Sequence, residues 1–160
     1  LAYYGGVFRA SKIRAKAVSG FHAIAAERPK IFGLDLFVAP YEAATHKVEA
    51  AAGWGKADAF YIRAWETYAT SIFSYQPPGD TPTRRAFFDS WMFACIPVIS
   101  ETTADVYRRL FDGRLFDAVS FDDIVVVVPD DLIADAAAII TVLEAMSPEA
   151  RRRRRDNLAR

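Results

Sequence analysis

Two adjacent arginines, Arg84 and Arg85, follow a turn rich in proline and glycine and begin a segment with helical spacing. Backbone N–H groups at the start of a helix are exposed, and the helix dipole favours an anion there. Two cations at this place oppose the dipole at a cost of ~0.3–1 kcal/mol. A diphosphate would instead accept charge-assisted hydrogen bonds from them, worth ~1.5–3 kcal/mol each. The pattern therefore predicts a diphosphate site.

Three polar residues flank this pair and have alternative roles. Thr81 is expected to be the N-cap of the helix, with proline at the first helical position, and it could also contact a phosphate. Asp80 either shapes the turn or contacts the ligand. Asp89 lies one helical turn beyond Arg85, where it could bind the ribose hydroxyls of a nucleotide, hold Arg85 in place, or form a surface salt bridge worth under ~1 kcal/mol.

The elements that must position these residues alternate between strand and helix, which predicts an α/β fold with a mostly parallel sheet. In such folds ligands bind where strand carboxyl ends face helix amino ends. Residues 40–52 favour neither helix nor strand clearly. Expected strands are 1–4, 31–38, 71–75, 96–99 and 124–128, and helices are expected to begin at Ser11, Asp58, Thr81 and Ser147, with a further helix containing residues 132–146.

Apolar residues at intervals of three and four predict the buried face of each helix. The same spacing makes Trp65 and Trp91 core residues rather than platforms for a sugar. The predicted buried faces are Ile13, Ala17, Phe21 and Ile24; Ile62, Trp65 and either Tyr68 or Ala69; Phe88, Trp91, Met92 and Cys95; and Leu132, Ala136, Ile139, Leu143 and Met146.

Composition excludes several classes of protein. An apolar share of 52% in 160 residues is typical of one folded domain rather than a disordered chain. Twenty basic residues balance twenty acidic ones, so no overall charge favours nucleic acid or a membrane surface. The single Cys95 excludes an internal disulfide, and there is no Asp-x-Asp motif, so no metal is predicted. Without an initiator Met, the chain is expected to be part of a longer protein.

The segment PPGDTPTRRAFFDS followed by ACIPVI resembles the exostosin family of inverting glycosyltransferases, and most closely its plant branch with xyloglucan galactosyltransferases. Upstream, the Gly5-Gly6 loop, Ile13-Arg14 and the turn 53–56 are also similar to the family. One departure lies at Phe93-Ala94, where the family commonly has a small residue and then glycine.

This resemblance implies a Rossmann-like three-layer sandwich, the C-terminal half of a GT-B fold. Residues 1–160 would then form a single donor-binding domain of a larger protein, with the acceptor domain and the membrane anchor outside it. The implied reaction transfers galactose or a related sugar from a UDP-sugar to a glycan, with inversion, in the Golgi lumen. The catalytic base is expected in the missing domain, so this part alone should be inactive. The implied donor contacts are Arg14, Asp80, Thr81, Arg84, Arg85 and Asp89.

Two rival functions remain open. A non-catalytic exostosin-like binding module would keep the fold and lack turnover. A nicotinamide oxidoreductase would need G-x-G-x-x-G after the first strand, which residues 5–9 do not supply. The arginine run 151–155 is interpreted as a solvated helix face or as a surface that packs against the rest of the protein.

Overall fold

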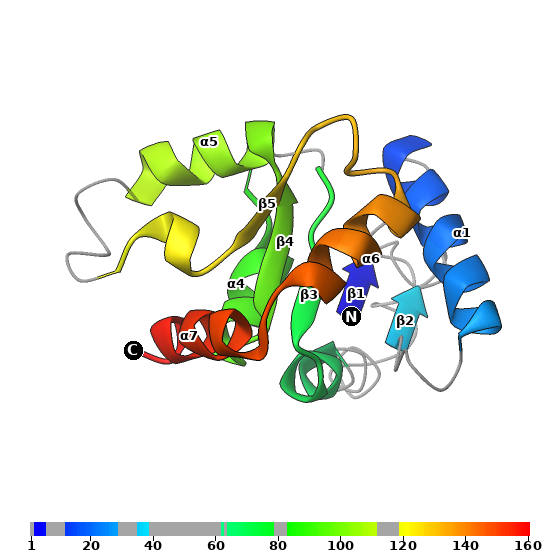
Figure 1. The fold of residues 1–160 in the computed structure, drawn as a ribbon. Coiled ribbons are helices and arrows are strands. Elements are labelled where there is room, and N and C mark those ends of the chain that lie inside the picture. The colour runs from blue at the N-terminus through cyan, green and yellow to red at the C-terminus, as the bar shows by residue number, and fades with distance from the viewer. Residues whose placement is uncertain are drawn as a thin grey trace, which may run out of the picture.

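The computed structural model describes residues 2–5, 12–28, 35–38, 62, 64–78, 83–111 and 119–160. Strands and helices alternate along these ranges (Figure 1). Residues 64–70 are also helical. The elements are β1 (Ala2–Gly5), α1 (Lys12–Glu27), β2 (Asp35–Val38), β3 (Phe73–Tyr75), α4 (Arg85–Met92), β4 (Ile96–Ser100), α5 (Glu101–Phe111), the 3-10 helix η3 (Phe121–Asp123), β5 (Val126–Val128), α6 (Ala136–Ala145) and α7 (Pro148–Leu158).

The five strands form one parallel sheet in the order β2-β1-β3-β4-β5. Between β1 and β3 the winding reverses, since β1 leads outward to β2 on one side and β3 leads to β4 on the other. This is the strand order of a doubly wound α/β domain, whose ligands bind at the switch point. The predicted Rossmann-like α/β fold with a parallel sheet is therefore confirmed.

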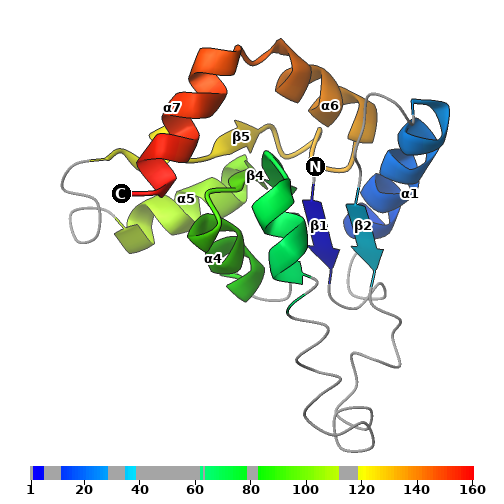
Figure 2. The same ribbon diagram turned by 90° about the horizontal axis from the view of Figure 1, so that it is seen from below.

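Helices cover both faces of the sheet, which gives three layers (Figure 2). On one face α1 packs against α6, and Arg28 forms an ion pair with Glu144 between them at 2.8 Å. On the other face α4 and α5 are joined by the stacked rings of Phe87 and Tyr107, whose centroids are 4.1 Å apart. The sheet is thus enclosed as parallel sheets require.

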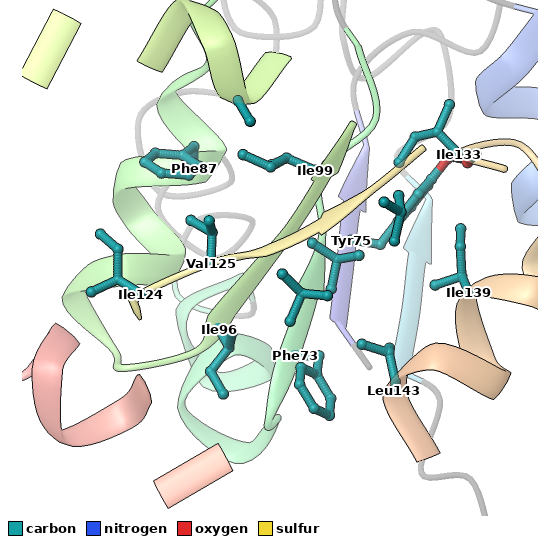
Figure 3. Close-up of a cluster of buried hydrophobic side chains, with 14 of the residues drawn as sticks. Phe73, Tyr75, Phe87, Ile96, Ile99, Ile124, Val125, Ile133, Ile139 and Leu143 are labelled. Carbon is teal, nitrogen blue, oxygen red and sulfur yellow. Dashed lines mark hydrogen bonds between the residues drawn. The ribbon is translucent and has the colours of Figure 1, made fainter. Parts of the chain in front are cut away.

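The core lies between the sheet and α6, and it continues to α4 (Figure 3). Every residue of β4 is buried, in agreement with the apolar run 96–99 that precedes Ser100. The Tyr75 hydroxyl satisfies its hydrogen-bonding need by donating to the Ile133 carbonyl at 2.6 Å. The buried core side chains labelled in Figure 3 are Phe73, Tyr75, Phe87, Ile96, Ile99, Ile124, Val125, Ile133, Ile139 and Leu143.

The last two helices begin at side-chain caps. Asp135 accepts from the backbone N–H groups of Ala137 and Ala138 at the start of α6. Ser147 accepts from Ala150 at the start of α7, with Pro148 in the first turn. The predicted beginning of the last helix at Ser147 is therefore confirmed.

Several predictions about α4 are wrong. The helix begins at Arg85, not near Thr81, because Arg84 has an extended backbone with φ −128° and ψ 136°. Met92, predicted to be buried, has 78% of its surface exposed. Cys95 is buried, as expected, but it follows the helix instead of lying on it.

Three other residues predicted to face the core are exposed, namely Ile13, Ile62 and Trp65. Helix α5 was absent from the predicted elements. Thr81, Asp80 and the ambiguous stretch 40–52 lie outside the described residues.

Helix α4 ends in a Schellman motif that places Ala94 in the left-handed region, with φ 50°. The Ala94 N–H donates to the Trp91 carbonyl at 2.8 Å, and the Cys95 N–H donates to the Ser90 carbonyl at 3.0 Å. A Cβ in this conformation is strained. The position therefore suits glycine, which adopts a positive φ without strain.

Replacing Ala94 with glycine is expected to stabilise the protein, because it removes that strain. We expect a gain of ~1 kcal/mol in the free energy of unfolding and a melting temperature ~2–4 °C higher. Calorimetric melting of the variant beside Ala23→Gly, an exposed position within α1, provides the comparison. That control should lose ~1 kcal/mol, and a loss in both variants would contradict the prediction.

Candidate functional site

The carboxyl edge of the sheet at the switch point collects most of the predicted site residues that the structure describes. Because the strands are parallel, the residues after β3 and the beginnings of α1 and α4 lie at the same edge. Arg14 is in the first turn of α1, and Arg84 immediately precedes α4. We call this set, with Pro77, Pro78 and Arg85, the switch-point edge.

Arg14 and Arg84 both bind the turn that follows β3. Arg14 Nη2 donates to the Pro78 carbonyl at 3.2 Å, and Arg84 Nη1 donates to the Pro77 carbonyl at 2.9 Å. Arg14 is only 4% exposed, so its charge lies largely out of water. Two guanidiniums from opposite sides of the switch point therefore meet at one short segment, although 70 residues separate them in the sequence.

The amino end of α4 is held by a tertiary contact rather than by a side-chain cap. Arg84, at the N-cap position, makes no side-chain capping bond. Its backbone N–H donates to the Tyr107 hydroxyl at 2.9 Å. Burial raises the pKa of this hydroxyl, and the hydrogen bond from Arg84 acts in the opposite direction. The hydroxyl thus stays protonated and fixes where the helix begins.

Arg85 and Asp89 form the ion pair that their spacing suggested, with 3.4 Å between Nε and Oδ2. The Arg85 side chain is 63% exposed, whereas that of Asp89 is 15% exposed. Because the Arg85 side chain is mostly in water, the pair contributes little to stability. The ribose role of Asp89 stays a prediction, and Asp80 and Thr81 lie outside the described residues.

A buried amide beneath this edge was not predicted from the sequence. The Gln76 backbone N–H donates to the Val98 carbonyl at 2.9 Å, and its side-chain Nε2 donates to the Ala86 carbonyl at 3.2 Å and to Ser74 Oγ. Gln76 therefore ties β3 to β4 and to the first turn of α4. Its position directly after a buried strand and before Pro77 was the only sequence signal.

The neighbouring helix α5 differs from α4, because a carboxylate of the chain caps it. Asp130 accepts from the Thr102 backbone N–H at 3.1 Å and from the Thr102 hydroxyl at 2.5 Å. These hydrogen bonds lower the pKa of Asp130. The amino end of α5 is thus already matched with a negative charge, whereas α4 has arginines there.

Other chemistry finds little support in the part of the chain that the structure describes. No three His, Cys, Asp or Glu side chains gather there as a metal site would require. Burial raises the pKa of the Cys95 thiol to about 12, so it is not a nucleophile at neutral pH. Among the same residues, no helix is both long and apolar enough to span a bilayer.

The fold and this edge define a doubly wound α/β domain with a basic switch point. The chain is similar to a probable xyloglucan galactosyltransferase of Arabidopsis thaliana, with 54% identity over 37 residues, 23% of this chain and 8% of that protein. A xyloglucan-specific galacturonosyltransferase of the same plant is 46% identical over 43 residues, 27% and 6% of the two chains. A second probable xyloglucan galactosyltransferase is 52% identical over 40 residues, 25% and 9% of the two chains.

The matched segments span less than a tenth of each relative. No protein-family model matches the chain, and no solved structure matches it significantly. These local similarities support a relation to plant glycosyltransferases.

Proposed function

We propose that this chain is the donor-binding domain of a polysaccharide glycosyltransferase and that the switch-point edge binds the diphosphate of a UDP-sugar. The observation that carries the proposal is the meeting of Arg14 and Arg84 at the Pro77–Pro78 turn. A doubly wound fold binds its ligand at this place, and two cations there suit a diphosphate. The similarity to xyloglucan glycosyltransferases supports glycosyl transfer as the class of reaction.

Each residue has a distinct part in the proposed site. Arg84 and Arg85 contact the phosphates beside the amino end of α4, and Arg14 adds a third positive charge from α1. Together they stabilise UDP as it leaves, which is electrostatic catalysis of departure. Since no metal is proposed, the arginines and the helix dipole neutralise the diphosphate. Asp89 binds the ribose, and Asp80 and Thr81 are further proposed contacts of the donor.

The wider proposal concerns the whole protein. In this proposal the whole protein is an exostosin-family enzyme of GT-B architecture, and residues 1–160 form its donor-binding half. It transfers galactose or a related sugar to a glycan with inversion at the lumenal side of the Golgi membrane. The acceptor site, the catalytic base and the membrane anchor belong to other parts of that protein.

Calorimetric titration with UDP tests the site. We expect micromolar binding, about −8 kcal/mol, that weakens at least tenfold in the double variant Arg84→Ala/Arg85→Ala. Arg109→Ala is the matched control, because Arg109 is an exposed arginine of the next helix. Thermal melting of each variant establishes that it is folded.

The outcomes separate the possible functions. If the double variant binds UDP as tightly as the unchanged protein does, the proposed site is wrong. Tighter binding of NADH than of UDP would indicate an oxidoreductase instead. Titration with UDP-galactose, UDP-galacturonate and UDP-glucuronate then ranks the donors.

A further inference from the structure

A second basic region lies at the opposite edge of the sheet, where α7 covers the amino ends of the strands. Arg154 Nε donates to the Val125 carbonyl at 3.0 Å, just before β5, and Arg155 Nε donates to the Ala94 carbonyl at 3.2 Å, just before β4. Between α7 and the residues that precede β3 and β4 there is a pocket of about 490 Å³. Its walls include Ile72 and Ala94 together with one side of α7.

Three arginines of α7 line this pocket, namely Arg151, Arg152 and Arg155. Their spacing brings them together along one side of the helix. Within the described residues none of the three forms an ion pair with a carboxylate, whereas the neighbouring Arg153 pairs with Asp123 at 3.8 Å. Asp156 is the one acidic residue among those that line the pocket. The pocket thus keeps an excess of positive charge, and its arginines repel one another.

One of these arginines, Arg151, is held in place by contacts with the rest of the domain. Arg151 Nη2 donates to the Leu143 carbonyl at 3.0 Å and to the Glu144 carbonyl at 3.3 Å, at the end of α6. Its guanidinium also lies over the Phe73 ring, 5.8 Å from the centroid. The Nε of Arg151 is buried and has no acceptor within the described residues. A buried donor without a partner is rare in folded proteins, so this arginine is held in place and incompletely satisfied.

We propose that this pocket binds a phosphate-type oxyanion, carried by a small organic ester whose apolar part lies against Ile72, Pro148 and Ala159. Arginine guanidiniums bind phosphate oxygens through paired hydrogen bonds. The apolar wall distinguishes an ester from the free anion, since Ile72 keeps 40% of its surface exposed. The site lies at the other end of the strands from the switch-point edge, so it does not depend on the proposed function.

Titration calorimetry at low salt tests this site, with phenyl phosphate as the ester and inorganic phosphate as the free anion. We expect saturable binding of phenyl phosphate that is at least tenfold weaker in Arg152→Gln/Arg155→Gln. Arg153→Gln is the matched control on the same helix and should bind as the unchanged protein does. Saturating UDP should leave the phenyl phosphate isotherm unchanged, because the two sites are separate. Added salt should weaken binding.

The results have distinct meanings. Absence of phenyl phosphate binding at millimolar concentration, or equal binding by the double variant with a normal melting temperature, would overturn the proposal. Displacement by UDP would also overturn it, because the ester would then occupy the donor site. Equal affinity for inorganic phosphate would overturn the ester and its contact with the apolar wall, and would leave a site for the free ion.

Discussion

Replacing Phe87 with alanine is expected to lower the free energy of unfolding by ~3–5 kcal/mol. The side chain is 1% exposed and lies where α4, α5 and η3 meet. Its ring stacks on Tyr107 at 4.1 Å and contacts the rings of Phe88 and Phe121 at 5.4 Å and 6.3 Å. Removing it leaves a cavity that these rigid rings cannot close, and aromatic contacts are lost as well.

Urea denaturation measures this loss. Met92→Ala is the control on the same helix, since Met92 is largely exposed, and it should change stability by less than ~0.5 kcal/mol. A loss under ~1 kcal/mol in Phe87→Ala would mean that α4 is not packed as described. Because Tyr107 also contacts the Arg84 backbone, we expect UDP binding to weaken in the same variant at temperatures where it stays folded.

Replacing Gly20 with alanine is expected to destabilise the protein by ~1–3 kcal/mol, although the same change within an exposed helix is stabilising. Gly20 lies in α1, where α1 packs against α6. A Cβ at this position would lie 2.8 Å from the Cβ of Ala136. Neither Cβ can rotate away, so the helices must separate.

A double variant identifies the cause. Ala136→Gly in the Gly20→Ala background removes the opposing methyl and should recover much of the lost melting temperature. Coupling of this kind is expected only for residues in contact. A stabilised single variant, as helix propensity alone predicts, would contradict the close approach of α1 and α6.

Local sequence patterns were sufficient to predict most of the sheet. The apolar runs at 71–75, 96–99 and 124–128 became β3, β4 and β5 with ends displaced by two residues or fewer. A continuous apolar run predicts a strand in this protein because helices cover both faces of the sheet, so side chains on both faces of the strand are buried. The beginning of α7 could also be predicted from local sequence, since Ser147 caps the helix and Pro148 lies in its first turn.

Tertiary contacts decided what the sequence could not predict. The cap signal at Thr81 was overridden because the Arg84 N–H binds Tyr107, 23 residues away. Helix α5 was missed because only Ala104, Tyr107 and Phe111 are buried among polar neighbours. From the local sequence, Arg14 has the pattern of a solvated arginine. Its burial could not be predicted because the Pro78 carbonyl that it binds is 64 residues away.

The hydrogen bonds of α7 define the extent of the folding unit. Arg154, Arg155 and Asn157 donate to the carbonyls of Val125, Ala94 and Asp123, and the Trp91 indole donates to Leu158. Without this segment, main-chain acceptors at the base of β4 and β5 would lose their donors and the side of Trp91 would be uncovered. Any recombinant version meant to fold independently must therefore retain residues 148–158.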